Sequence, residues 1–198
     1  MTSAGAASAS EPETASSFFY GTLMAPEVFF TVCYRLGRPP AALIKQHPFQ
    51  DAMLHGYTRH RVQGQDYPGI IEDSTEGACV RGMLAEGITE TNMHRLDVFE
   101  GREYERRTVD VDIEVEGVKK TVKAQVYVYK KPDRLERREW DFEEFRREKM
   151  HKWARADLTF EGEQPQETFR QRDDRRTGNQ RSSKPQKSKK PQPGCIVC

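Results

Sequence analysis

Glu100 stands where a segment of helical periodicity meets a glycine. Met93, Leu96 and Phe99 recur at helical spacing before it, which predicts Glu100 at a helix C-terminus, where the helix dipole disfavours a negative charge. Phe99 and the nearby Tyr104 could give the carboxyl an apolar wall, and desolvation raises a carboxyl pKa toward the range of a general base. A solvated acid is the alternative interpretation. Four other glutamates are candidates on composition alone: Glu86, Glu90, Glu103 and Glu105.

A second candidate is the turn Tyr20-Gly21-Thr22-Leu23-Met24, which follows a short apolar run and precedes Pro26. Glycine lets the backbone turn with its N–H groups exposed, and consecutive N–H groups form a concavity that suits a carboxylate. An ordinary strand-to-helix turn is the alternative. In a third segment, residues 64–69, Tyr67 and Pro68 could line a pocket, although a plain hairpin loop is the simpler interpretation of this segment in isolation.

The elements that position these residues follow from the spacing of apolar side chains. Strands are predicted at residues 18–20, 49–62 (with a bend at Gly56), 69–71, 78–84, 109–115 and 122–128. The last two form a hairpin through Glu116-Gly117. Helices are predicted from Pro26 to Gly37, from a Thr89 cap to Glu100, and from an Asp141–Glu144 capping box to about Ala156. Since strands and helices do not alternate regularly, we expect an α+β fold, a small mixed or antiparallel β-barrel with flanking helices.

The composition divides the 198 residues into three zones. Residues 17–160 hold nearly all the aliphatic and aromatic side chains and are predicted to form the folded domain. Residues 1–16 are rich in Ala and Ser, lack the features of a signal peptide, and are expected to be a disordered leader. Residues 161–198 are too polar to offset their chain entropy and are expected to be disordered. A cytoplasmic location is the expectation for such a chain.

Four motifs, taken in order, resemble those of the gamma-glutamylcyclotransferase-like family, and most closely its avirulence-induced-gene-like branch. They are Tyr-Gly-Thr-Leu-Met, Gly-x-Asp-Tyr-Pro-Gly, Leu-Asp-x-Phe-Glu-Gly-x-x-Tyr-x-Arg and a Val-Tyr-Val-Tyr strand. The resemblance covers residues 17–156. It implies a barrel of six or so strands with flanking helices and a pocket at its mouth.

The same resemblance implies an activity and a set of site residues. Glu100 would be the catalytic residue: it takes a proton from the α-amino group of a small gamma-glutamyl substrate. The amine then attacks the gamma-carbonyl and closes a ring, so that 5-oxoproline and an amine or amino acid leave, with no metal or cofactor. Tyr104 would wall the pocket. The substrate's α-carboxylate end would bind the loop residues Tyr20, Gly21, Thr22, Leu23, Met24 and Ala25. Thr22-Leu23 stand where the branch acting on free gamma-glutamyl amino acids has Ser-Asn, which leaves the substrate preference open.

The C-terminal tail suggests a separate role. Residues 170–198 carry nine basic and two acidic residues, a net +7, which leaves −6 for residues 1–169. Cys195-Ile196-Val197-Cys198 has the shape of a prenylation box, and a lipid at Cys195 together with the basic residues would hold an anionic membrane surface. An unmodified basic tail is the alternative. A rival function is therefore a membrane-tethered binding module that uses the same pocket without turnover. Nucleic acid is not expected as a partner, because the tail lacks interleaved aromatic residues that stack on bases.

Overall fold

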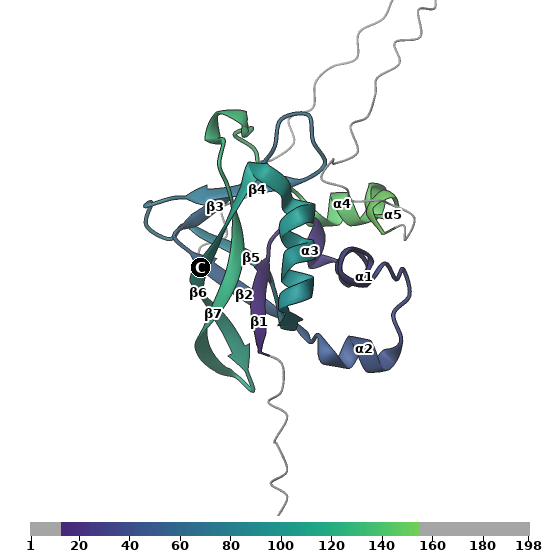
Figure 1. Cartoon of the computed structure of the whole chain (residues 1–198). Coiled ribbons are helices and arrows are strands. Elements are labelled where there is room, and N and C mark those ends of the chain that lie inside the picture. Colours follow the sequence, from purple (N-terminus) through teal and green to yellow (C-terminus); the bar gives the residue numbers. More distant parts are fainter. Residues whose placement is uncertain (1–12, 155–198) are drawn as a thin grey trace, which may run out of the picture. The chain divides into compact units, whose positions relative to one another are not determined.

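The fold is a small β-barrel with helices packed outside it, and the computed structural model describes residues 13–154. Five strands close in the order β1-β5-β2-β6-β7 (Figure 1). They are β1 (Thr14–Phe19), β2 (Phe49–His55), β5 (Cys79–Thr89), β6 (Tyr104–Val115) and β7 (Val118–Tyr129). Neighbours are antiparallel except β1 and β7, which pair in parallel through Ser17 and Gln125. The expected α+β barrel with flanking helices is confirmed, and the barrel has five strands.

The predicted strand 49–62 is interrupted, and the strand predicted at residues 69–71 lies outside the barrel. Gly56 adopts a positive φ of 76°, which glycine tolerates without steric cost. After this bend β3 (Tyr57–Arg61) leaves the barrel and pairs with β4 (Pro68–Glu72) in a separate two-stranded sheet. This sheet lies against the barrel mouth, and an added Cβ on Gly69 would come within 2.7 Å of the Tyr129 side chain of β7.

The β6–β7 hairpin is confirmed. Its turn residues Glu116 and Gly117 have φ of 53° and 76°, the left-handed pair that matches the twist of two-residue hairpins. Inward-facing Val111 is buried, and charged residues alternate with it along the outer face. The strand begins at Tyr104, five residues before the predicted start, because its whole length pairs with β7 as far as Tyr129.

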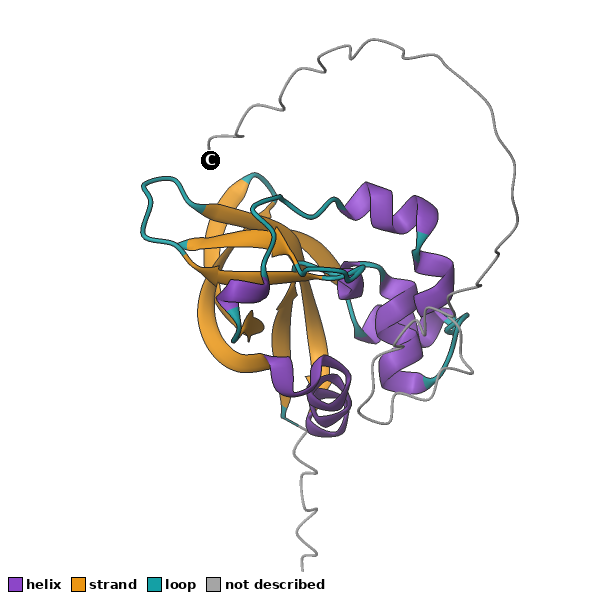
Figure 2. Cartoon of the chain, turned by 90° about the horizontal axis from the view of Figure 1, so that it is seen from above, coloured by secondary structure: helices purple, strands orange, loops and turns teal. Residues whose placement is uncertain are grey.

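The helices gather mainly on one side of the barrel (Figure 2). They are η1 (Thr22–Met24), α1 (Pro26–Tyr34), α2 (Ala41–Gln46), α3 (Glu90–Glu100), η2 (Gly101–Glu103), η3 (Pro132–Arg134), α4 (Phe142–Glu148) and α5 (Met150–Trp153). Thr89 caps α3 as predicted, accepting from the Asn92 N–H at 3.3 Å. No helix among residues 13–154 is both long enough and apolar enough to cross a bilayer.

Three predicted helix and domain limits need correction. The first helix ends at Tyr34 instead of Gly37, because Arg35 takes the left-handed conformation and its N–H bonds back to Phe30 and Thr31. The last predicted helix is divided into two helices, α4 and α5, with Lys149 between them. The domain begins before residue 17, because Thr14 already pairs with Thr89 of β5 through its backbone, which needs no apolar side chain. The expectations for residues 1–12, for 161–198 and for Cys195 lie outside the described residues.

Two hydrophobic clusters meet along β1, because successive strand residues face opposite sides. Phe18 and Tyr20 belong to the cluster inside the barrel, together with Leu84, Val111 and others. Phe19 belongs to the cluster between the barrel and the helices, with Phe29 and others. The loop after β1 therefore begins at the boundary of the two cores.

Candidate active site

A pocket with an empty volume of about 420 Å³, counting its open mouth, lies where β1 ends. Residues 18–23 form one side of it, with Pro68, the first residue of β4, and Tyr67 just before that strand. The other side is made by Phe99 and Glu100 at the end of α3, with Tyr104, Tyr127 and Trp153. Eight of the 13 lining residues are Phe, Tyr or Trp, so the walls are largely aromatic.

Glu100 is the one ionisable acid or base of the Asp, Glu, Lys, Arg and His types among the described residues that line this pocket. Burial raises the pKa of its carboxyl to about 8, with a smaller contribution from the negative charge of Asp97. Among residues 13–154 no hydrogen bond or ion pair compensates the carboxylate. A carboxyl in such surroundings holds its proton near neutrality and can exchange it with a ligand in the pocket.

The other four candidate glutamates have different surroundings. The Glu103 carboxylate pairs with Lys131 at 2.9 Å, and Glu105 pairs with Arg107 at 2.7 Å. Glu86 accepts from the Gln50 side-chain amide at 2.9 Å, and Glu90 is exposed in the first turn of α3. None of the four lines the pocket, so the tertiary structure singles out Glu100.

A polar relay lies behind Glu100, one helical turn earlier on α3. The Asp97 carboxylate accepts from the Tyr127 hydroxyl at 2.8 Å and pairs with Arg106 Nε at 2.9 Å. Asp97 therefore has two donors on its carboxylate, and its negative charge contributes to the raised pKa of Glu100. Tyr127 both lines the pocket and bonds this relay, so it links the pocket wall to the helix that carries Glu100.

The loop facing Glu100 is fixed by hydroxyl groups on either side. Tyr20 donates its hydroxyl to the Tyr127 carbonyl at 2.6 Å, and Tyr104 donates to the Pro68 carbonyl at 2.8 Å. Within the described part of the chain, the N–H groups of residues 21–23 donate no hydrogen bond, as expected for the first residues of a short helix. They are available to a carboxylate placed in the pocket.

The family described as "Gamma-glutamyl cyclotransferase, AIG2-like" matches residues 17–147 of this chain. The chain belongs to this family. The Arabidopsis thaliana relative "Protein AIG2 C" is 33% identical over 138 residues, which cover 69% of this chain and 75% of the relative. "AIG2-like protein C" from the same plant is 35% identical over 144 residues, covering 72% and 76%.

Solved structures share the fold of this AIG2-like chain. The solution structure of one Arabidopsis thaliana protein superimposes with a TM-score of 0.52 at 29% identity, covering 75% of this chain and 82% of that one. A second solution structure from the same plant gives 0.50 at 30% identity, covering 70% and 83%. The sequence resemblance to the gamma-glutamylcyclotransferase-like family is thus confirmed.

In this family member most of the predicted site residues lie together. Tyr20, Gly21, Thr22, Leu23, Glu100 and Tyr104 all line the pocket. Met24 and Ala25 do not: Ala25 is buried at the start of α1, and the Met24 sulfur lies 3.9 Å from Arg59 Nη1. Their side chains face the protein because η1 turns the chain away from the pocket after Leu23.

Sequence reasoning missed four aromatic wall residues of the AIG2-like pocket: Phe18, Phe19, Tyr127 and Trp153. Tyr127 lies in the Val-Tyr-Val-Tyr strand, whose alternation could have placed it on the same face as Tyr129. Trp153 was interpreted as a packing anchor, and its ring does pack edge-on against Tyr67 and Phe99, at centroid distances of 6.2 Å and 5.9 Å. Residues 13–154 contain no cluster of three or more His, Cys, Asp or Glu side chains that could hold a metal ion.

Proposed function

We propose that this protein is a gamma-glutamyl cyclotransferase, which converts a gamma-glutamyl compound into 5-oxoproline and a free amine or amino acid. The observation that carries the proposal is Glu100, a desolvated carboxyl in an aromatic pocket opposite a loop with unused N–H groups. The family to which the chain belongs supports the reaction class. A membrane-tethered binding module has no comparable support, because the residues that would tether it lie outside the described range.

Substrate binding would prepare the base. The α-ammonium group of the substrate is a cation, and its approach stabilises the carboxylate form of Glu100, which in the empty pocket has a pKa of about 8. The α-carboxylate of the substrate would accept from the N–H groups of residues 21–23. These two contacts would hold the amine and fold the glutamyl chain toward its own gamma-carbonyl, and such positioning supplies much of the acceleration of an intramolecular reaction.

The chemistry would then proceed by proton transfer through Glu100. Its carboxylate takes one proton from the α-ammonium, and the neutral amine attacks the gamma-carbonyl carbon. A new carbon–nitrogen bond closes the five-membered ring, and the original gamma-amide bond breaks. The leaving nitrogen takes the proton back from Glu100 and takes up the second proton lost by the ring nitrogen, so it departs as an ammonium and charge is conserved.

The test is release of 5-oxoproline from a panel of gamma-glutamyl amino acids, gamma-glutamyl amines and glutathione. Wild-type protein is expected to turn over at least one member. Glu100→Gln is expected to lower kcat/KM by roughly 10²–10⁴-fold, the usual contribution of a general base. Glu103→Gln is the matched control, because this glutamate lies outside the pocket lining, and it is expected to retain turnover.

The outcomes separate the interpretations clearly. No release from any substrate by folded wild-type protein would reject the proposal in favour of a binding function of the same pocket. Release that survives in Glu100→Gln would keep the reaction and reject Glu100 as its base.

A further inference from the structure

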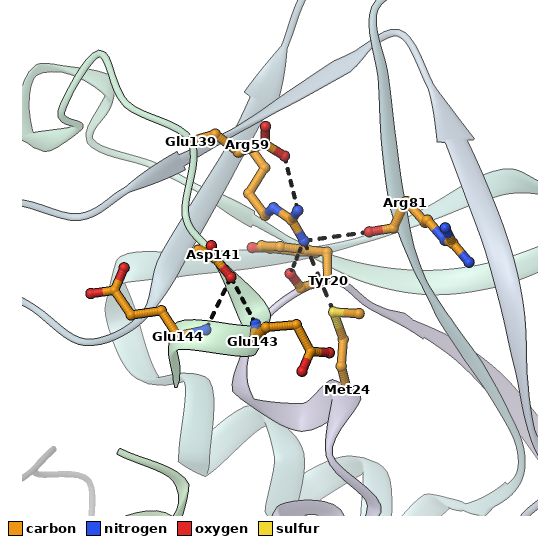
Figure 3. Close-up of polar contacts among 8 residues, drawn as sticks. All are labelled: Tyr20, Met24, Arg59, Arg81, Glu139, Asp141, Glu143 and Glu144. Atoms are coloured by element: carbon orange, nitrogen blue, oxygen red, sulfur yellow. Dashed lines mark hydrogen bonds and ion pairs between the residues drawn. The ribbon is translucent and has the colours of Figure 1, made fainter. Parts of the chain in front are cut away.

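Arg59 of β3 reaches from the two-stranded sheet to the start of the loop of residues 20–25 (Figure 3). Its Nη1 donates to the Tyr20 carbonyl at 2.9 Å and to the Arg81 carbonyl at 3.4 Å. Its Nη2 pairs with Glu139 at 3.0 Å, and the guanidinium lies 5.7 Å from the centroid of the Trp140 ring. One side chain thus joins β3, the end of β1, β5 and the segment before α4.

The burial of Arg59 is not explained by stability alone. Its side chain is 13% exposed, while that of its ion-pair partner Glu139 is 75% exposed, so the pair is only partly shielded. The Arg59 Nε is buried with no hydrogen-bond partner among the described residues. Burying a cation with an unsatisfied donor is unfavourable, and such an exception calls for another reason.

That reason is found in the orientation of one peptide group. Carbonyl and N–H point in opposite directions across a planar trans peptide. The peptide between Tyr20 and Gly21 is trans, and Arg59 holds its carbonyl, so the Gly21 N–H is directed away from Arg59. Within residues 13–154 this N–H has no acceptor.

The same sheet also holds the loop from its second strand. Pro68 at the start of β4 lies so close to Gly21 that an added Cβ would come within 2.9 Å of the proline Cγ. The Tyr104 hydroxyl in turn donates to the Pro68 carbonyl at 2.8 Å. β3 therefore contacts the carbonyl side of the peptide and β4 contacts its glycine, which leaves the peptide little freedom to rotate.

We propose that Arg59 is a positioning residue: it fixes the Tyr20–Gly21 peptide so that the Gly21 N–H stays directed at the carboxylate of the substrate. This inference rests on the proposed function for the identity of the ligand. The orientation of the loop itself does not depend on it. Arg59 acts through the backbone and makes no contact with the substrate.

Two variants of the full chain test the role. Arg59→Met keeps the apolar stem against Trp140 and removes the donors. Arg59→Lys keeps the positive charge. Its single ammonium group can contact the Tyr20 carbonyl or Glu139, but it cannot contact both as the planar guanidinium does. Arg81→Met is the matched control, since that side chain is 71% exposed and only its carbonyl meets Arg59.

The kinetic measurement compares an accepted gamma-glutamyl substrate with the same compound carrying an α-carboxamide. In Arg59→Met, KM for the carboxylate form is expected to rise roughly tenfold, the equivalent of one charge-assisted contact, while KM for the carboxamide form changes little. Arg59→Lys is expected to lie between Arg59→Met and wild type, and Arg81→Met to match wild type. An equal change for both substrates, or no change, would overturn the inference, because only a positioning role acts through the carboxylate.

Hydrogen exchange supplies a readout that needs no turnover. In Arg59→Met the amides of Met24 and Ala25, which donate to the Gly21 and Thr22 carbonyls at 3.0 Å and 3.2 Å, are expected to exchange faster. The amides of β5 and β7 are expected to be unaffected, and Arg81→Met to match wild type. If wild-type protein releases no 5-oxoproline, the proposed function fails, and hydrogen exchange alone tests whether Arg59 positions the loop. Faster amide exchange in Arg59→Met that is confined to the loop supports this role. Unchanged exchange in both Arg59→Met and Arg59→Lys rejects it.

Discussion

At the scale of single residues, the site depends on how few partners Glu100 has. Asp97 is one turn away and has two donors, Tyr127 and Arg106, whereas the Glu100 carboxylate has none among the described residues. The two acids of one helix therefore differ in their surroundings, and burial raises the pKa of Glu100 to about 8. A carboxyl whose pKa is raised by desolvation inside a pocket is a candidate acid–base group.

The pH dependence of turnover follows from this raised pKa. The base must be a carboxylate in the free protein, and its pKa is about 8, so kcat/KM is expected to rise with pH and level off above that value. The measurement is the pH profile of kcat/KM, corrected by separate titration of the substrate's α-amino group. A profile that is flat from pH about 6 to 9 would contradict the assignment.

Stability should respond to the same group. The folded pKa of about 8 lies above the ordinary value of 4.5, so the folded state binds more protons between these values. Below pH 4.5 the Glu100 carboxyl is neutral in both the folded and the unfolded state and does not destabilise the fold. As pH rises from 4.5 to about 8, burying this carboxyl lowers the free energy of unfolding, and above about 8 this destabilisation stays constant. The free energy of unfolding of Glu100→Gln, taken relative to that of wild type, is expected to be greater at alkaline pH than at acid pH by on the order of 2–4 kcal/mol. Urea unfolding at both pH values measures it, and Glu103→Gln should show no comparable gain.

At the scale of elements, a buried polar network ties α1 to α3 and to the end of α2. His47 Nδ1 donates to the Glu86 carbonyl at 3.0 Å, because a carbonyl oxygen can only accept, and His47 Nε2 accepts from the Tyr34 hydroxyl. That hydroxyl accepts from the Asn92 amide at 2.6 Å, and the Asn92 oxygen accepts from Arg95 at 3.1 Å. Each group in the chain is satisfied, and α3 is thereby held at the angle that brings Glu100 to the pocket.

Removing the central hydroxyl should therefore be costly. Tyr34→Phe leaves His47 and Asn92, which are 2% and 3% exposed, each short of a partner. We expect the free energy of unfolding to fall by about 1–3 kcal/mol. Tyr57→Phe is the control, because within the described residues its hydroxyl makes no hydrogen bond. Equal losses in the two variants, measured by urea denaturation, would mean that the network contributes nothing specific.

At the scale of the whole molecule, the barrel closes through β1, which lies between β5 and β7. Closure requires a close approach at one point of β5: a Cβ on Gly82 would lie 2.3 Å from the Phe19 carbonyl and 2.6 Å from the Phe18 ring. Because the loop of residues 20–25 begins directly after Phe19, the packing that closes the barrel also places this loop.

Gly82→Ala should therefore disturb both the barrel and the site. The added methyl has to displace backbone or a packed ring, and we expect a loss of roughly 1–3 kcal/mol of unfolding free energy, as for overpacked cores. Gly37→Ala is the matched control, since its Cβ would meet its nearest neighbour at an ordinary 3.5 Å. Thermal unfolding of both variants provides the comparison, and a Gly82→Ala protein as stable as Gly37→Ala would contradict this account of closure.

The sequence by itself determined what depends on neighbours along the chain. The Thr89 cap, the Glu116-Gly117 hairpin and the loop after β1 follow from local backbone preferences, and the ordered motifs around Glu100 indicate the family. Local patterns placed the end of α1 only approximately. The left-handed conformation that ends a helix is most common in glycine, so Gly37 was the expected end, but Arg35 adopts this conformation two residues earlier.

Only the tertiary structure decided which groups meet. It moved β3 and β4 out of the barrel, brought Tyr127 and Trp153 to the pocket wall, and placed Arg59 on the Tyr20 carbonyl. It also distinguished Glu100, which is buried in the pocket, from four other glutamates that do not line it, because desolvation of a carboxyl depends on surfaces contributed by distant segments. Spacing along the chain can show that a carboxyl ends a helix, but its proton affinity is set by what packs around it in three dimensions.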